Sequence, residues 1–221
     1  MDRCSVAPLS TDAVWGVVDR ERAELADLLD GLSDDQWDTP SLCGAWRVRD
    51  VAAHLTLAHM RPGRALVEAV RARGSFDVMV RDTALRHADA TSRAELVAQL
   101  RAMVGSRRHA PGITPLEPLL DVLVHGQDIR LPLGLPRAMP LDAAATAATR
   151  VWTAGWPVSR AFAARRRLRG LRLVADDVEW SVGEGAVVDG PLEALLLVLT
   201  GRSAAVRGRL RGPGSAVLAT R

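Results

Sequence analysis

The stretch PLLDVLVHGQDIRLPLG, residues 118–134, has the composition of a buried helix, and two polar residues interrupt its apolar run. Asp121 and His125 stand four residues apart, so a helix places them on one face, one turn apart. A carboxylate and an imidazole in an otherwise apolar segment need polar partners. The pattern predicts a helix that starts near Pro115, ends by Pro132 and directs its polar pair towards a partner.

Helical spacing of apolar residues recurs on both sides of this stretch. Ser10 or Thr11 can cap the first of these helices and Gly31 can end it. A break or kink is expected at Pro62-Gly63 in the second. The predicted helices cover residues 10–31, 47–74, 91–106 and 140–156, in addition to the helix from 115 to 132. Several sizeable helices joined by short loops are typical of a helical bundle.

The composition changes towards the end of the chain. A basic connector, AARRRLRG at residues 163–170, precedes LRLVADDVEWSVGEGAVVDGP at 171–191, whose alternation and glycines predict short strands. PLEALLLVLTGR, residues 191–202, predicts a short apolar helix, and the last residues could return as a strand. We therefore expect a helical domain over residues 1–160 and a small α+β domain over residues 165–221.

Composition places the 221-residue chain among soluble globular proteins. It is 48% hydrophobic and 25% charged, with a net charge of +3 and arginine as its only strongly basic residue type. No apolar run approaches the ~20 residues that cross a bilayer, and residues 1–14 lack the apolar core of a signal peptide. Two cysteines, Cys4 and Cys43, are too few for a disulfide framework. We expect a cytoplasmic monomer or weak homodimer with no membrane or nucleic-acid partner.

Asp121 and His125 could ligate one divalent ion, with a third ligand from another helix. Of the five histidines, His54 suits this role best because apolar residues surround it. His59 lies five residues further on and points elsewhere, while His87 and His109 lie in polar, loop-like surroundings. An acid–histidine pair at this spacing can equally be a hydrogen-bonded structural pair, so the spacing leaves both interpretations open.

Two nearby carboxylates have simpler expected roles. Asp50, four residues before His54, could contribute to the same site, but an acid in the first helical turn also complements the helix dipole. Asp128 and Arg130 follow His125 and are expected to cap the helix or pair around its end.

Two segments resemble a known family, the mycothiol-dependent maleylpyruvate isomerases of actinobacteria. They are LSDDQWDTPSLCGAWRVRDVAAHL at residues 32–55, with Trp37 and the Cys43-Gly44-Ala45-Trp46 element, and HGQDIRLPLGLP at 125–136. The family belongs to the DinB-like group of metal-binding four-helix bundles. The resemblance implies a mainly α fold, in which such a bundle carries a small C-terminal α+β domain similar to sterol-carrier folds.

The resemblance also implies a metal site and a chemistry. Its ligands would be His54, Asp121 and His125 around a divalent metal, zinc in the family; the family pattern carries glutamate where this chain has Asp121. The thiol cosubstrate would be mycothiol, whose thiolate adds to the cis double bond of a small acidic substrate. Arg202 would bind the anionic substrate. These implications describe a thiol-using isomerase or transferase, with no catalytic residue assigned beyond the metal site.

Other interpretations remain open. Cys43 could be a nucleophile, although it suits loop packing better. The arginines of residues 165–169 could contact nucleic acid, although such a run is typical of a solvated surface. Trp37 and Trp46 suit a core or the mouth of a pocket. The chain could also be a metal-binding or regulatory module without turnover, since Asp121 departs from the family pattern.

Overall fold

The computed structural model describes residues 2–4, 6–60, 62–109, 113–155, 159 and 162–220. The chain divides into two compact units, Thr11–Arg137 and Met1–Ser10 with Ala138–Arg221. Within the described residues, every helix is too short or too polar to cross a membrane.

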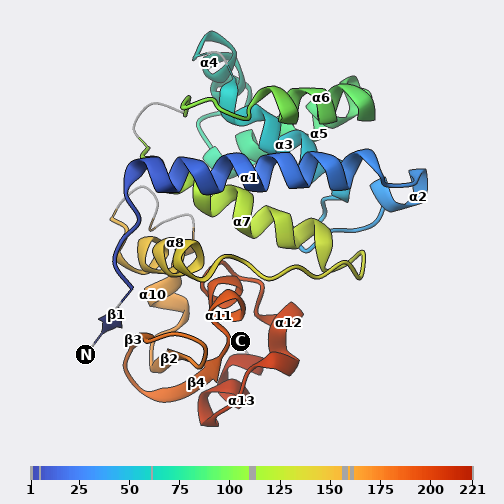
Figure 1. Cartoon of the computed structure of the whole chain (residues 1–221). Coiled ribbons are helices and arrows are strands. Elements are labelled where there is room, and N and C mark those ends of the chain that lie inside the picture. The colour runs from blue at the N-terminus through green and yellow to red at the C-terminus, as the bar shows by residue number, and fades with distance from the viewer. Residues whose placement is uncertain are drawn as a thin grey trace. The chain divides into compact units, whose positions relative to one another are not determined.

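The first unit, Thr11–Arg137, is entirely helical within its described residues (Figure 1). The central helices are α1, α3, α6 and α7: α1 and α3 each contact both α6 and α7, while α5 packs along α3. The elements are α1 (Thr11–Asp30), α2 (Asp34–Trp37), α3 (Val48–Thr56), the 3-10 helix η1 (Leu57–His59), α4 (Pro62–Arg71), α5 (Phe76–Ala90), α6 (Arg93–Ala102) and α7 (Leu116–Arg130).

The core of this unit comes from the apolar faces that the sequence predicted. Leu25 and Leu29 of α1 and Leu96 and Leu100 of α6 are fully buried, and α1 lies alongside both α6 and α7. Burial of a side chain of this kind contributes about 1.5–3 kcal/mol. The apolar run of α7 is buried at Leu119 in the same way. The predicted mainly α fold is confirmed.

The sequence analysis missed two helices of this unit, the short α2 and the longer α5, and with α5 it misplaced a histidine. α5 follows Ser75, whose hydroxyl oxygen accepts a hydrogen bond from the backbone N–H of Val78 and so caps the helix. His87 lies within α5, so the expectation of loop-like surroundings for it was wrong. The break near Pro62 was correct, because α3 and η1 end before that residue and α4 begins at it.

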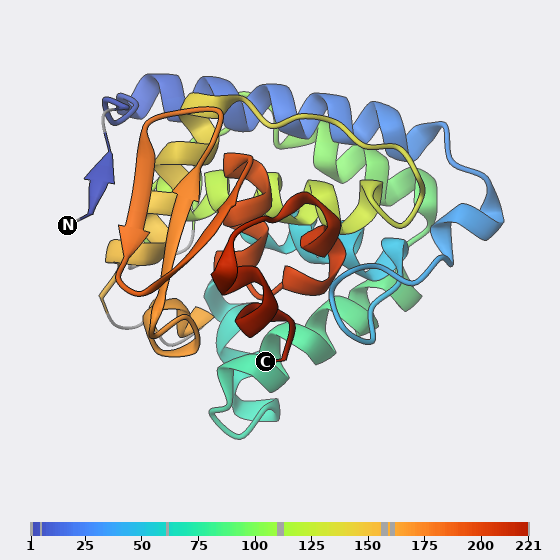
Figure 2. The same ribbon diagram turned by 90° about the horizontal axis from the view of Figure 1, so that it is seen from below.

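The second unit contains a four-stranded sheet in the order β1-β3-β2-β4. Its strands are β1 (Arg3–Cys4), β2 (Leu171–Ala175), β3 (Trp180–Gly183) and β4 (Ala186–Gly190). β3 pairs antiparallel with both β1 and β2, and β2 pairs parallel with β4. The first residues of the chain thus form an edge strand beside a segment about 180 positions later (Figure 2). The strands predicted over residues 171–191 are confirmed.

Helices cover this sheet. α11 (Leu192–Leu199) contacts β2 and also α8 (Leu141–Thr153), and α13 (Pro213–Ala219) contacts β4. The remaining short elements are α10 (Ala164–Arg167), α12 (Ser203–Val206) and η2 (Arg207–Arg209). α8 therefore belongs to the second compact unit. Trp156, the last residue of the helix predicted here, lies outside the described residues, and the domain boundary expected at residues 160–165 stays a prediction.

The residues that the structure describes after α11, up to Thr220, form no strand, so the expected return as a strand was wrong. Among them only Arg211 pairs with the sheet, through an isolated bridge to Asp189. Gly212 then turns with a φ of 87°, and Pro213 starts α13 at a position where its missing N–H costs nothing. A glycine followed by proline thus ends the extended segment after one residue.

Candidate metal centre

The helix that carries His54 is fixed at its start by an acid. The buried Asp50 accepts hydrogen bonds from the backbone N–H of Arg47 at 2.8 Å and from the guanidinium Nε of the same residue at 3.0 Å. Asp50 thereby closes the first turn of α3 and lies outside the groups of potential metal ligands. One turn further on, α3 presents the partly buried imidazole of His54.

The structure brings His54 together with the polar pair of α7. Oδ1 of Asp121 lies 3.5 Å from Nε2 of His54 and 3.4 Å from Nε2 of His125. The two imidazole centroids are 4.9 Å apart, with the rings nearly perpendicular at 77°. One ligand atom from each residue lies within 4.8 Å of those from the other two. Three donors from two helices therefore converge on one point.

The electrostatics of the group favour a charged carboxylate. Burial raises the pKa of Asp121, but the charge of His54 and the hydrogen bonds with both imidazoles outweigh it and hold that pKa well below its usual range. Burial lowers the pKa of His125, while hydrogen bonds with Asp121, Asp128 and Cys43 raise it well above its usual value. An anionic oxygen thus sits between two imidazoles. A divalent cation can take the place of the protons that these three groups share.

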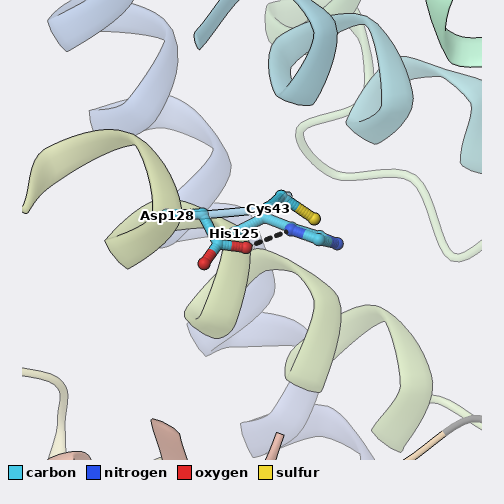
Figure 3. A group of neighbouring side chains, drawn as sticks. All are labelled: Cys43, His125 and Asp128. Carbon is cyan, nitrogen blue, oxygen red and sulfur yellow. Dashed lines mark hydrogen bonds and ion pairs between the residues drawn. The ribbon is translucent and has the colours of Figure 1, made fainter. Parts of the chain in front are cut away.

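A second carboxylate orients His125. Oδ2 of Asp128, which is fully buried, lies 2.7 Å from Nδ1 of His125 (Figure 3). When Nδ1 carries the proton and donates it to Asp128, Nε2 keeps its lone pair towards Asp121 and His54. Asp128 pairs near the helix end, as expected, but its partner is the imidazole itself. The His-x-x-Asp spacing, which places the two side chains on one helix face, is the signal that could have indicated this role.

One aromatic side chain and one thiol, those of Trp46 and Cys43, border the group. The ring of Trp46, which is buried, lies with its centroid 5.2 Å from that of His54 and 6.5 Å from that of His125. Cys43 and Trp46 also line a cavity of about 330 Å³, which Phe76 and Arg81 help to enclose. Trp46 therefore both packs against the histidines and forms part of a pocket wall, whereas Trp37 is buried in the core.

The other histidines do not join the group. His87 contacts the hydroxyls of Thr56 and Thr91 and the side chain of Gln99 through its ring nitrogens. His109 stacks on Trp15 with the ring centroids 6.2 Å apart. Burial, reinforced by the charges of Arg22 and Arg108, lowers the pKa of His59.

The predicted substrate-binding Arg202 lies in the other compact unit, immediately before α12. Its guanidinium donates to the carbonyl oxygen of Thr200 at 2.6 Å. In the arginine run of residues 165–169, Arg167 donates to the carbonyl oxygens of Phe162 and Leu199. The substrate role of Arg202 stays a prediction, and Arg167 serves the packing of its own unit.

Comparison with known proteins identifies the helical unit. Residues 18–118 match the family model of the mycothiol maleylpyruvate isomerase N-terminal domain. Most of the helical unit is therefore similar to this family. A comparison with curated proteins found no significant match.

Two solved structures share the fold of this chain. One is a mycothiol-dependent maleylpyruvate isomerase, with a TM-score of 0.61, 13% sequence identity and coverage of 94% of each chain. The other is a variant of a mycothiol-dependent maleylpyruvate isomerase with one histidine replaced by alanine; its TM-score is 0.60, its identity 12% and its coverage again 94% of each chain. At this identity the likeness shows the fold, including the small sheet-containing part.

Proposed function

We propose that the chain is a metal-dependent enzyme that uses a low-molecular-weight thiol, mycothiol, to isomerise or modify a small acidic substrate. The observation that carries the proposal is the convergence of two imidazole nitrogens and one carboxylate oxygen from α3 and α7. The family match over residues 18–118 supports the thiol and the substrate class.

The donor set fits a divalent ion, zinc in particular. Zinc is commonly held in catalytic sites by three nitrogen or oxygen donors with one position left open. His54, Asp121 and His125 supply such a set, with donor atoms within 4.8 Å of one another. Asp121 is one methylene shorter than the glutamate of the family pattern, yet its Oδ1 already lies 3.4 and 3.5 Å from the two imidazole nitrogens. The shorter side chain therefore reaches the point of convergence.

When bound, the metal would lower the pKa of a thiol in its open position and so supply a thiolate at neutral pH. The residues around it have roles of their own. Asp128 holds the proton of His125 on Nδ1, which keeps Nε2 available as a donor. Trp46 lies against both histidine rings and restricts water on that side.

For a maleylpyruvate-like substrate the proposed reaction needs three steps. The thiolate adds to one carbon of the cis double bond, which leaves a single bond between the two carbons. Rotation about that bond follows, and elimination of the thiolate gives the trans isomer, fumarylpyruvate. The thiol is regenerated, so atoms and electrons balance. Arg202 is the proposed partner of a substrate carboxylate.

Metal stoichiometry tests the first part of the proposal. The purified chain should bind one equivalent of zinc, and His54→Ala and Asp121→Ala should each lose most of it. His109→Ala, at a histidine outside the group, is the matched control and should keep the full equivalent. Retention of a full equivalent by both site variants would reject the ligand assignment.

Turnover tests the second part. Maleylpyruvate should be converted only when both zinc and mycothiol are present. A chain that binds one equivalent of zinc at these residues but converts neither this substrate nor a related thiol acceptor would instead be a metal-binding module without turnover. The departure at Asp121 from the family pattern is the feature that favours this second candidate.

A further inference from the structure

The described residues contain a second group of potential ligands, formed by Cys43, His125 and Asp128 (Figure 3). One ligand atom from each lies within 4.8 Å of the other two. Asp128 faces Nδ1 of His125, whereas Asp121 faces Nε2 of the same ring. His125 thus belongs to both groups of donors, with one carboxylate at each ring nitrogen.

Backbone contacts hold Cys43 beside α7. The N–H of Leu42 donates to the carbonyl oxygen of Asp128 at 3.2 Å, which ties the loop to the helix one residue before the cysteine. The N–H of Cys43 donates to the hydroxyl of Ser41 at 3.0 Å, and the carbonyl oxygen of Cys43 accepts from the N–H of Trp46 at 3.2 Å. The position of the thiol next to the imidazole is therefore fixed by the loop and not only by its own rotamer.

The donors of this second group differ in chemistry from those of the first. A thiolate sulfur, an imidazole nitrogen and a carboxylate oxygen suit a cation that favours sulfur, whereas the first group offers only nitrogen and oxygen. Cys43 is partly exposed and also lines the cavity of about 330 Å³, so an ion can reach it from that side. The buried carboxylate of Asp128 would balance the charge of an ion held there.

We propose that Cys43, His125 and Asp128 form a second site for a thiophilic divalent cation, such as Cd²⁺, and that its occupation excludes a metal from the His54–Asp121–His125 centre. A neutral imidazole has one lone pair on its two nitrogens. When Nδ1 binds the cation, its proton moves to Nε2, which then has no lone pair for the first centre. The Cys43 thiol proton is released to solvent when the sulfur binds the cation as a thiolate.

Binding of Cd²⁺ to the metal-free, full-length chain tests the site. Thiolate ligation of Cd²⁺ produces charge-transfer absorption in the ultraviolet, which should rise to saturation at one equivalent. Cys43→Ser should abolish this absorption, and Cys4→Ser, at the exposed cysteine of the other unit, should leave it unchanged. Asp128→Asn should weaken Cd²⁺ binding about tenfold or more. Absorption that persists in Cys43→Ser, or that is lacking in the unsubstituted chain, overturns the proposal.

Two further measurements separate this site from the proposed function. His54→Ala should keep the Cd²⁺ absorption, because His54 belongs only to the first centre; its loss would mean that Cd²⁺ binds elsewhere than proposed. The exclusion itself rests on the proposed zinc centre, so zinc-loaded protein should release one zinc for each Cd²⁺ bound. Simultaneous retention of zinc and Cd²⁺ would refute the proposal that one site excludes the other. Failure to load zinc would refute the first centre, and the Cys43 site would then be judged by the Cd²⁺–thiolate absorption alone.

Discussion

Replacement of Asp128 by asparagine should weaken zinc binding at the His54–Asp121–His125 centre, although Asp128 is not among the proposed ligands of that centre. The carboxylate accepts the Nδ1 proton of His125 at 2.7 Å and is fully buried, so water cannot take over its role. An asparagine amide can turn its NH2 group towards Nδ1 as a donor. The imidazole would then carry its proton on Nε2, the nitrogen that faces Asp121.

The size of the effect follows from the role of such partners in other metal sites. Removal of a carboxylate that orients a ligating histidine commonly costs about 10–100-fold in metal affinity. This range corresponds to about 1.4–2.7 kcal/mol of binding free energy. We expect the upper part of the range here, because Asp128 has no exposed surface through which solvent could compensate.

A competition titration against a chromophoric zinc chelator at neutral pH measures this change. Asp50→Asn is the matched control, since Asp50 is also a buried carboxylate of the same unit but hydrogen-bonds to Arg47 and to no histidine. Circular dichroism of both variants checks that the helices remain folded. If the zinc affinity of Asp128→Asn stays within twofold of that of the unsubstituted chain, the orienting role is refuted. An equal loss of zinc affinity in Asp50→Asn would mean that the effect comes from general destabilisation.

Three further predictions follow from the geometry. Asp121→Glu, which keeps a carboxylate, should still bind one equivalent of zinc in elemental analysis, whereas Asp121→Asn should bind it at least about tenfold more weakly. The pKa of His59 is lowered in the folded chain, so folding stability should fall as the pH drops below the unfolded pKa of about 6.5 towards the folded pKa. Denaturant unfolding of His59→Gln across this pH range should show a smaller loss of stability on the acid side. An unchanged loss would exclude His59 as the cause. Gly185→Ala should destabilise the second unit by about 1–3 kcal/mol or more in thermal unfolding. The reason is that the φ of 123° disfavours other residues and that an added Cβ would collide with the carbonyl oxygen of Gly170. An unchanged melting temperature would contradict this.

Local pattern was sufficient to predict most helices and the meeting of the three proposed ligands. The apolar periodicity around α1, α6 and α7 matches their buried faces, since the same residues that repeat at helical spacing form the core. The apolar surroundings of His54 indicated an inward position, and the structure places it near the Asp121–His125 pair. Whether these residues bind a metal stays a prediction.

The missed features depend on contacts between residues far apart in sequence or on weak local signals. α5 has a low share of buried apolar residues, so its periodicity is faint and the sequence around His87 is typical of a loop. The proximity of Cys43 to His125 arises from a loop that α7 anchors through Leu42 and Asp128, over 80 residues apart. Spacing within either segment could not have revealed it.

The pairing of β1 with β3 has a consequence for the order in which the chain can fold during synthesis. All residues of the helical unit, Thr11–Arg137, are contiguous, so that unit can fold as soon as it has left the ribosome. The sheet cannot be completed then, because Arg3 and Cys4 must wait for Ser181 and Trp180 to emerge. Until nearly the whole chain has been made, Arg3 and Cys4 have no strand to pair with, and a fusion or truncation next to them should disturb the unit that is synthesised last.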